Sequence, residues 1–374
     1  MAGIAEAHRM KLAMALYHYF PYGGLQRDFA RIAREAVSRG HEVVALVSDW
    51  QGETIDGVTV QSIAVSGRSN HGRMQSFASG VLSAIDQGDF DRVLGFNRLP
   101  GLDVYFAADS CFAEHVSSKP AAVGWLPRYA TYLKLEKAVT AADGPLILFL
   151  NDDQRSQYQA HYPLTEARYR LLPPGIERDR RRTDNYQQLR ARLRADLELA
   201  DDEPALLFLG SGFKIKGLDR ALAAFASQPA PLRLLIVGND DAAPYLKVLS
   251  DEQRARVSVL GPRDDVPALL QAADLLLHPA YRESAGMVLL EAAVAGLPVL
   301  TTDTCGYARY VREAGAGEVI ASPFDQQALN RTMANMLAQR PGPWSAAGVE
   351  YGQQESLYRL PETVVNWLEE SVRD

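Results

Sequence analysis

Two doubly wound α/β domains, each built on a parallel sheet, are predicted by three features of the sequence. Short apolar runs alternate with helical patterns along the whole chain, which is typical of βαβ units. One strongly punctuated segment, Pro173-Pro174-Gly175, divides the alternation into two series. The length of 374 residues also suits two domains of ordinary size. Because ligands bind at the carboxyl ends of parallel strands, we expect a binding cleft between two facing domains.

The first domain is predicted to span residues 1–174. Its first strand, Lys11–Tyr17, ends at a turn with Gly23 and Gly24, and a helical pattern then runs to Gly40. The other expected elements are strands at Glu42–Ser48, Val58–Ile63, Arg92–Phe96, Val104–Ala107 and Leu146–Leu150, and a helix at Asp152–Tyr162.

The second domain is predicted to span residues 175–350 and to begin with an Arg-rich interdomain connection, Glu177–Arg194. Residues 351–374 contain an amphipathic helix, Leu360–Val372, which we expect to pack back on the first domain. The strands expected here are Ala205–Leu209, Leu232–Val237, Arg256–Leu260, Leu275–His278, Val299–Thr302 and Glu318–Ala321.

The composition excludes several classes of protein. With 47% hydrophobic and 23% charged residues the chain is globular, and its net charge of −7 argues against nucleic acid as a partner. Two distant cysteines, Cys111 and Cys305, cannot form a disulfide scaffold. Met1–Arg9 lacks the apolar core of a secretory signal, and no apolar run is long enough to span a bilayer. We expect a cytoplasmic protein that is at most peripheral to a membrane.

The most specific pattern lies in the second domain, where two acids flank the start of a helix. Glu283 follows a buried strand, Gly286 opens the helix, and Glu291 lies in its second turn. The N–H groups of Ala285, Gly286 and Met287 would be available to a phosphate or sugar oxygen. Glu283 would accept hydrogen bonds from sugar hydroxyls, and Glu291 from a ribose diol. The structural alternative is a capping acid with a surface acid or a paired buried acid.

A second pattern is a Gly-rich turn with two lysines after the first strand of that domain. Gly210 and Gly212 precede Lys214 and Lys216, and a helix is expected to follow. Lysines placed there can neutralise a diphosphate leaving group, although either alone would be an ordinary solvated side chain. The turn lacks the third glycine of a dinucleotide-binding fingerprint, since Ile215 stands at that position.

Two weaker patterns lie in the first domain. Gly23 and Gly24 would let a ligand approach the backbone, with Arg27 and Asp28 in the first turn of the next helix, but such turns are common. Asp109 follows a strand and would orient, or accept a proton from, an acceptor hydroxyl. A helix N-cap is an equally good interpretation of Asp109.

A metal site is not predicted. Asp89-Phe90-Asp91 precedes a strand instead of following one, which is the wrong place for a nucleotide–metal site. The histidines show no ligand spacing such as H-E-x-x-H.

Together these segments resemble glycosyltransferase family 4, whose members have the GT-B fold of two Rossmann-like domains. Glu283 and Glu291 match the E-x7-E motif of that family. The resemblance runs from about Met10 to the C-terminus and is strongest to members that build the lipopolysaccharide core. It rests on the segments YHYFPYGGLQRD, GFNRLPGLDVYFAAD, LPPGIERDR, AADLLLHPAYRESAGMVLLEA and GLPVLTTDTCGYARY.

The resemblance implies an activity and a place in the cell. A retaining, metal-independent transferase would move a hexosyl residue, α-glucosyl first, from a UDP-sugar to the inner-core heptose of lipopolysaccharide. The enzyme would lie at the cytoplasmic face of the inner membrane of a Gram-negative cell. UDP-galactose or a UDP-N-acetylhexosamine as donor, a GT-B UDP-sugar epimerase, and a non-catalytic nucleotide-binding protein are the alternatives.

Roles for individual residues also follow from the resemblance. Glu283 would contact the sugar, Glu291 the ribose, and Lys216 with Arg180 the diphosphate. The glycine pair and the aspartate of the first turn, Gly23, Gly24 and Asp28, would line the cleft. Asp109 stands where many members carry a histidine.

The sequence departs from the family at one cation. Gly210-Ser211 replaces the usual Gly-Arg, so Lys214 would take the place of the missing arginine. No protein nucleophile stands out, and the leaving diphosphate can itself take the acceptor proton. The main task of the enzyme would then be to stabilise the charge that develops on UDP.

A basic and aromatic segment, Phe112–Lys137, suits an anionic membrane surface. The alternative is an internal amphipathic helix whose charges face water, and the lipid-linked acceptor favours the membrane. The residues concerned are Lys119, Trp125, Arg128, Tyr129, Tyr132, Lys134 and Lys137.

Overall fold

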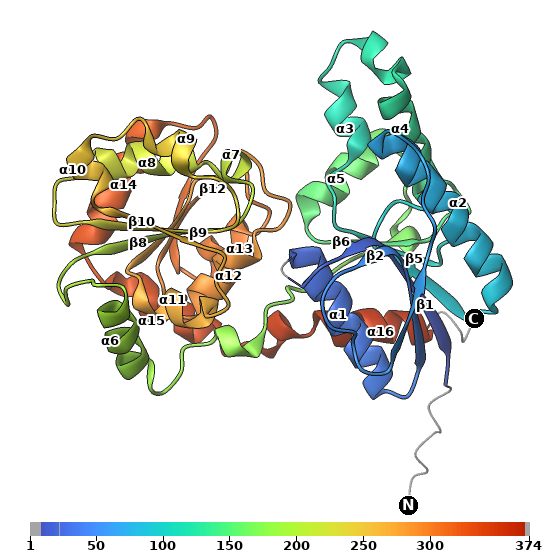
Figure 1. Ribbon diagram of the computed structural model, residues 1–374, viewed down its shortest axis with the longest axis horizontal. Coiled ribbons are helices and arrows are strands. Elements are labelled where there is room, and N and C mark those ends of the chain that lie inside the picture. The colour runs from blue at the N-terminus through green and yellow to red at the C-terminus, as the bar shows by residue number, and fades with distance from the viewer. Residues whose placement is uncertain (1–8, 22, 371–374) are drawn as a thin grey trace, which may run out of the picture. The chain divides into compact units, whose positions relative to one another are not determined.

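The structure is a computed structural model that describes residues 9–21 and 23–370. It consists of two compact units: Figure 1 shows one in blue to green together with the red C-terminal helix, and the other in green to orange. Unit 1 comprises Met1–Gly175 with Arg359–Asp374, and unit 2 comprises Ile176–Tyr358. The segment Met1–Arg9, which lacks the apolar core of a secretory signal, lies outside the described residues except for Arg9. Each unit is a parallel sheet covered by helices, which confirms the predicted fold class.

Unit 1 contains a seven-stranded sheet in the order β3-β2-β1-β4-β5-β6-β7. Neighbouring strands pair in parallel throughout. The strands are β1 (Lys11–Tyr19), β2 (Glu42–Trp50), β3 (Val58–Ser62), β4 (Arg92–Gly95), β5 (Val104–Ala107), β6 (Leu146–Phe149) and β7 (Tyr169–Leu171). The edge strand β7 has no counterpart in the sequence analysis, because three residues are too few to show a period.

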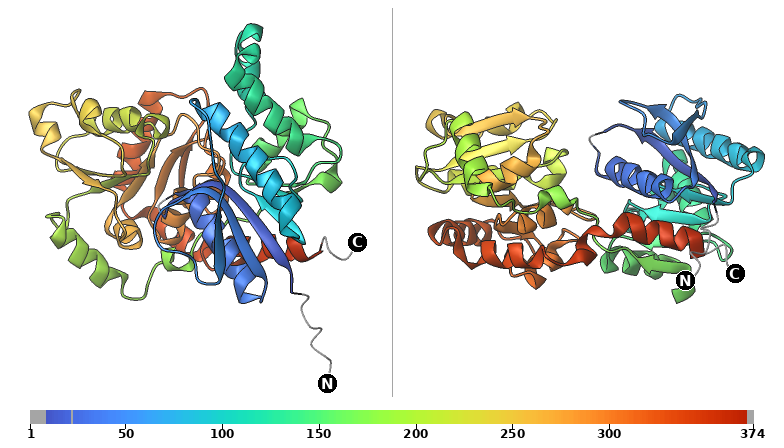
Figure 2. Two further views of the ribbon diagram at one scale, coloured as in Figure 1. Left: turned by 45° about the vertical axis from the view of Figure 1, so that its right-hand side comes forward. Right: turned by 90° about the horizontal axis from the view of Figure 1, so that it is seen from below.

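Helices cover both faces of this sheet, which is why its central strands are nearly continuous apolar runs (Figures 1 and 2). The helices are α1 (Gly24–Ser38), α2 (Asn70–Gly88), α3 (Phe112–Ser117), α4 (Pro127–Thr140), α5 (Asp152–His161) and α16 (Leu360–Glu370), with short 3-10 turns η1 (Ala121–Trp125) and η2 (Glu166–Arg168). Side chains of α2, α4 and α5, among them Phe77, Val139 and Tyr158, pack on one face of the sheet.

The last helix of the chain, α16, lies against α1 within unit 1. Its buried face includes Val364 and Leu368. Polar contacts fix its far end, because Arg39 donates to Asn366 Oδ1 at 2.6 Å and pairs with Glu369 at 3.1 Å. The predicted helix Leu360–Val372 is therefore present, although its final residues lie outside the described part of the chain.

Unit 2 contains a six-stranded sheet in the order β10-β9-β8-β11-β12-β13. The strands are β8 (Ala205–Leu209), β9 (Arg233–Val237), β10 (Val257–Gly261), β11 (Leu275–His278), β12 (Val299–Thr302) and β13 (Gly317–Ile320). Successive residues of β8 point to opposite faces: Leu207 packs with α6, α11, α12 and α13, and Phe208 packs with α8 and α14. The helices of unit 2 are α6 (Tyr186–Asp196), α7 (Phe213–Lys216), α8 (Leu218–Ala226), α9 (Ala243–Leu246), α10 (Asp251–Arg254), α11 (Val266–Ala272), α12 (Met287–Val294), α13 (Ala308–Glu313), α14 (Gln326–Ala338) and α15 (Gly342–Tyr351), with 3-10 turns η3 (Arg178–Arg180) and η4 (Glu355–Tyr358).

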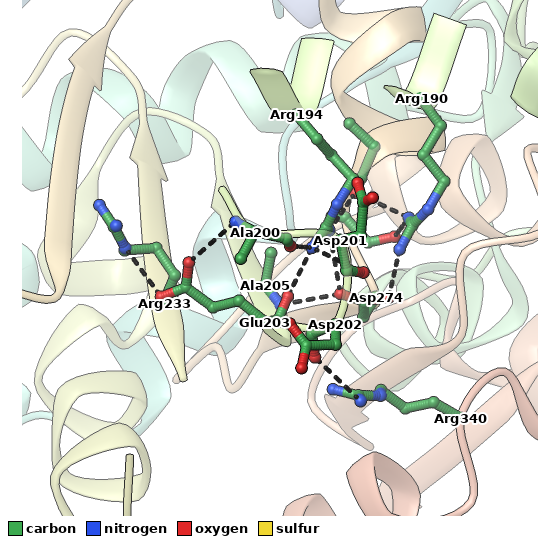
Figure 3. A network of polar contacts seen from close by, with 12 residues as sticks. Arg190, Arg194, Ala200, Asp201, Asp202, Glu203, Ala205, Arg233, Asp274 and Arg340 are labelled. Atoms are coloured by element: carbon green, nitrogen blue, oxygen red, sulfur yellow. Dashed lines mark hydrogen bonds and ion pairs between the residues drawn. The ribbon is translucent and has the colours of Figure 1, made fainter. Parts of the chain in front are cut away.

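The Arg-rich segment 177–194 is part of unit 2, so its interpretation as an interdomain connection is wrong. Figure 3 shows what its arginines do. Arg190 and Arg194 on α6 both pair with Asp274, at 2.6 and 3.4 Å. Arg194 is buried and also donates to the carbonyl oxygens of Ala200 and Glu203, at 2.5 and 2.6 Å. These charges fasten α6 to the start of β8 and β11.

The strand order gives each unit one topological switch point, where the chain turns from one half of the sheet to the other. It lies between β1 and β4 in unit 1 and between β8 and β11 in unit 2. In open α/β sheets, ligands bind outside the carboxyl ends of the strands at this point. The search for functional side chains therefore begins at the ends of these four strands.

Candidate active site

The turn after β8 brings one lysine back over the end of the strand. Gly210 and Gly212 have φ values of 139° and 78°, which glycine adopts without strain. A Cβ placed on Gly210 would lie 3.9 Å from Lys216 Cε, so the lysine side chain passes close to the bare backbone. Lys214 and Lys216 lie on the short helix α7, and not in a loop before a helix as predicted.

The loop after β11 is held rigidly opposite this turn. Glu283 donates its N–H to Thr304 O at 3.1 Å and accepts from Gly306 N–H at 3.0 Å. Tyr281 N–H donates to Ile215 O at 2.8 Å and so joins the loop to α7. The backbone that carries Glu283 is therefore fixed on both sides.

Lys216 and Glu283, both predicted site residues, form an ion pair through Nζ and Oε2. Each side chain is largely buried, and burial lowers the pKa of Lys216. The sequence analysis assigned both residues to one site, and the structure brings them into contact. Whether they hold a donor remains a prediction.

His278, the last residue of β11, lies directly behind this pair. Its Nε2 is 3.8 Å from Glu283 Oε2, and the residue is 0% exposed. Burial, followed by the charge of Lys216, lowers the pKa of His278 to about 3, so the ring is neutral at physiological pH. The sequence analysis gave His278 no role. The available signal was its place at the end of a predicted buried strand.

The start of α12 has the predicted form. Gly286 is its N-cap residue with a φ of 84°, and Ala285 and Met287 flank it. Farther along α12, Glu291 is buried and lies 3.5 Å from Arg180 Nε. The structure thus joins Arg180 and Glu291, and the paired buried acid that the sequence analysis left open describes Glu291 in this state.

Lys214 is not part of this cluster. Its side chain is exposed on α7, and within residues 9–21 and 23–370 it makes no ion pair. The prediction that Lys214 binds a diphosphate therefore rests on the resemblance alone.

The predicted residues of unit 1 lie around the end of β1 and the start of α1. Gly23 is the N-cap of α1 and Gly24 its first residue. Asp28 is buried and lies 3.7 Å from Arg31. This placement beside the switch point is compatible with the predicted roles but does not test them.

Asp109 lies beyond the end of β5 with its side chain 63% exposed, 3.7 Å from Arg98. The alternative role of helix N-cap is wrong, because the N-cap of α3 is Cys111. The buried Glu136 does the capping instead: it accepts from Phe112 N–H at 2.6 Å and pairs with Arg98 at 3.0 Å. The sequence analysis missed Glu136, since an acid inside a helical pattern gives no sign that it is buried.

Neutral polar groups line the switch point of unit 1 itself. Asn97, after β4, accepts from Tyr17 N–H at 2.7 Å and bridges the two strands. Ser48 Oγ donates to Tyr17 O, so it can only accept from His18 Nδ1, 3.2 Å away. This assignment leaves His18 Nε2 as an unprotonated acceptor. Burial is the main cause that lowers the pKa of His18. The charge of Asp49 opposes this shift, and the charge of Arg73 adds to it.

Metal ligands and membrane spans were sought over the same described residues. No three acidic, histidine or cysteine side chains lie close enough together to hold a metal ion there. No helix among them combines the length and apolar character needed to cross a bilayer.

Comparison with known proteins gives one consistent result. Residues 22–180 match the family model described as Glycosyltransferase Family 4, and residues 190–354 match that of Glycosyl transferases group 1. The chain is 41% identical over 363 residues to the lipopolysaccharide glucosyltransferase WaaG of Escherichia coli K12, covering 94% of this chain and 97% of that protein.

Solved structures agree with the sequence comparison. A crystal structure of WaaG, described as a glycosyltransferase involved in lipopolysaccharide biosynthesis, has a TM-score of 0.89 at 39% identity and covers 96% of this chain and 99% of its own. The sucrose-phosphate synthase of Thermosynechococcus elongatus, at 19% identity, has a TM-score of 0.77 with 98% of each chain covered. This second likeness shows the fold alone.

Proposed function

Because the chain belongs to glycosyltransferase family 4, we propose that it transfers a glucosyl residue from UDP-glucose to an inner-core heptose of lipopolysaccharide, with retention of configuration. The near full-length similarity to a lipopolysaccharide glucosyltransferase supports the donor and the acceptor. The observation that carries the proposal is the Lys216–Glu283 pair at the switch point of unit 2. A cation in contact with a carboxylate at this strand end supports the proposal, because a nucleotide diphosphate sugar offers a diphosphate to the cation and hydroxyl groups to the carboxylate.

The donor reaction follows from these charges. The bond from the anomeric carbon to the diphosphate oxygen breaks as the bond to the acceptor oxygen forms on the same face. The acceptor proton passes to the leaving phosphate. Lys216 and the N–H groups of Gly286 and Met287 stabilise the charge that grows on the diphosphate, since the first turn of a helix has no internal partners for its N–H groups. Glu283 holds sugar hydroxyls.

The nucleoside and the acceptor use other residues. Glu291 accepts from the ribose, while Arg180 and Lys214 add positive charge near the diphosphate. The acceptor binds at the carboxyl ends of the unit 1 strands, where His18 Nε2, after β1, and Asp109, after β5, each accept a hydrogen bond from a hydroxyl group of the acceptor other than the one that reacts. The reaction needs no metal, because these cations and helix N–H groups take the place of one.

Peripheral membrane binding is a further part of the proposal, and it rests on the segment of α3, η1 and α4, whose outer end projects from the sheet of unit 1 in Figure 1. Trp125 is 89% exposed and Leu126 is also exposed, while Arg128 and Lys134 are exposed nearby. Two predicted aromatic contributors, Tyr129 and Tyr132, instead have ring contacts with Phe112 at 5.9 and 5.4 Å. Trp125 is therefore the membrane residue to test.

Vesicle binding tests this surface. The wild-type chain should sediment with vesicles that contain anionic phospholipid and not with zwitterionic vesicles, and Trp125→Ala should weaken binding. Val248→Ala, which removes an exposed apolar side chain of unit 2, is the matched control. Equal loss in both variants, or no binding by the wild type, would contradict the membrane assignment.

A donor and acceptor screen tests the activity. UDP-, GDP- and ADP-sugars are each incubated with the protein, alone and with core lipopolysaccharide that ends at the inner heptose. Transfer from UDP-glucose with α-linked product is expected. Faster transfer from UDP-galactose or a UDP-N-acetylhexosamine would change the donor, a new UDP-sugar formed without acceptor would indicate an epimerase, and binding without turnover would leave only a nucleotide-binding protein.

A further inference from the structure

We infer that His278 is a positioning residue for Glu283, and that Glu283 exchanges Lys216 for His278 when a nucleotide diphosphate sugar binds. The inference rests on the proposed function and adds to it a second partner for the acidic residue of the site. It starts from a buried side chain that the donor reaction leaves unexplained.

Burial of His278 without hydrogen-bond partners costs free energy of folding. Neither ring nitrogen makes a hydrogen bond within the described part of the chain, although the residue is fully buried. Buried polar groups are nearly always hydrogen-bonded, so a ring with two unused nitrogens indicates a partner that arrives in another state. The backbone cannot move to find one, because β11 pairs with β12 and Thr301 Oγ1 donates to His278 O at 2.9 Å.

Glu283 is placed to become that partner. Its Oε2 lies 3.8 Å from His278 Nε2, just beyond hydrogen-bond distance. A carboxylate only accepts, so Nε2 must carry the proton of the neutral ring. The backbone of Glu283 is tied to Thr304 and Gly306, and therefore a small side-chain rotation is the movement required.

In the ligand-free protein Lys216 pairs with Oε2 and holds this oxygen 3.8 Å from His278 Nε2, beyond hydrogen-bond distance. A diphosphate beside Lys216 competes with the carboxylate for its ammonium and repels the carboxylate. Once Lys216 turns to the diphosphate, Glu283 would be a buried acid without a cation. The His278 N–H then replaces the lost contact and leaves Oε1 free to accept from a sugar hydroxyl.

The exchange predicts that one variant binds UDP more tightly although it transfers sugar more slowly. Glu283→Gln removes the competitor for Lys216, so it should strengthen binding of UDP about fivefold or more, a usual size for coupling between sites. The same variant should transfer sugar about tenfold to a hundredfold more slowly, because it loses a charged hydrogen bond to the sugar. Substitution of a residue that merely supports the fold would not raise UDP affinity while it lowers the transfer rate.

The second arm of the experiment uses His278. His278→Phe keeps an aromatic ring but has no donor, so UDP should bind about fivefold more weakly and kcat should fall about tenfold. His278→Gln retains an N–H at similar reach and should recover most of both losses. His41→Gln, at a buried histidine of unit 1, is the matched control and should leave UDP affinity unchanged.

A double-variant cycle decides between positioning and structural support. Calorimetry with UDP is done on the wild type, Glu283→Gln, His278→Phe and the double variant, and UDP-glucose turnover is measured in parallel. In the Glu283→Gln background, His278→Phe should no longer change UDP affinity. Equal losses in both backgrounds, or weaker UDP binding by Glu283→Gln, would overturn the inference.

The two proposals fail in distinguishable ways. If the wild type turns over no UDP-sugar, the proposed function is wrong, whereas the UDP-affinity cycle still tests the exchange. If His278→Phe does not fold, as judged by circular dichroism, His278→Gln and Glu283→Gln carry the test. Loss of UDP affinity in Glu283→Gln then contradicts the exchange without His278→Phe.

Discussion

The two switch points of this chain have the same topology but different chemistry. At the ends of β8 and β11, unit 2 places opposite charges, Lys216 and Glu283, in direct contact beside a buried neutral histidine. At the ends of β1 and β4, unit 1 places the neutral hydrogen-bonding groups of His18 and Asn97. The difference matches two tasks, since a leaving diphosphate needs positive charge, whereas a sugar acceptor is held by hydrogen bonds from its hydroxyl groups to neutral side chains.

Lys216→Ala removes the positive charge at the switch point of unit 2 and should lower the reaction rates more than any of the other variants. Loss of one preorganised donor to developing charge lowers rates by about 10²–10³. Donor hydrolysis and transfer should fall together. Lys214→Ala is the comparison variant: that lysine is exposed and outside the pair, so both rates should fall less than in Lys216→Ala. If Lys214→Ala is the damaging variant, the roles of the two lysines are reversed.

Unit 1 also contains buried charges, and Glu136→Gln tests whether they serve the fold. Glu136 pairs with Arg98 and caps α3, so its removal takes the buried acidic partner from Arg98 and leaves the exposed Asp109 at 3.7 Å. The free energy of unfolding should fall by about 3–5 kcal/mol, measured by denaturant titration. Glu114→Gln removes a more exposed acid that contacts His161, and it should cost less than about 1 kcal/mol. Equal stability of both variants would mean that Glu136 is free for chemistry.

His18→Phe tests the neutral side of the comparison. Transfer should fall about tenfold, the loss expected for one hydrogen bond, while donor hydrolysis stays near the wild-type rate. Because burial lowers the pKa of His18 below 6.5, its acceptor form persists into mildly acidic solution. Transfer should therefore decline only as the pH falls through that lowered pKa. A decline centred above pH 6.5 in the wild type, absent in His18→Phe, would contradict the assigned protonation state.

Metal removal should have the smallest effect. If Lys216 and the start of α12 supply the positive field, transfer should continue in excess EDTA at nearly the full rate. Dialysed protein assayed with and without EDTA, and then with added Mg²⁺ or Mn²⁺, gives the comparison. Loss of activity that either ion restores would replace the metal-free mechanism.

Strands that are buried on both faces could be predicted from the sequence, because short, mostly apolar runs between helical patterns mark them. β5, β8, β11 and β12 have the predicted bounds, while β7 is too short to show a pattern. The order of the strands in each sheet could not be predicted from hydrophobic periodicity, which identifies elements but not their neighbours. That order decides which strand ends become neighbours.

Those site residues that belong to a motif within one short segment of the sequence could be predicted. Glu283 and the start of α12 lie in one segment, and the Gly-rich turn identifies Lys216. His278 and His18 could not be found this way, since their importance depends on partners from distant segments. Glu136 was missed for the same reason: its burial depends on Arg98 and α3, which no helical pattern reveals.

The ratio of transfer to acceptor-free donor hydrolysis tests the division of tasks most directly. Both rates are measured with UDP-glucose for the wild type, Lys216→Ala and His18→Phe. We expect the ratio to stay near the wild-type value in Lys216→Ala, where both rates fall, and to drop about tenfold in His18→Phe, where only transfer falls. A ratio that drops in Lys216→Ala, or hydrolysis that falls with transfer in His18→Phe, would contradict the assignment of donor chemistry to unit 2 and acceptor binding to unit 1.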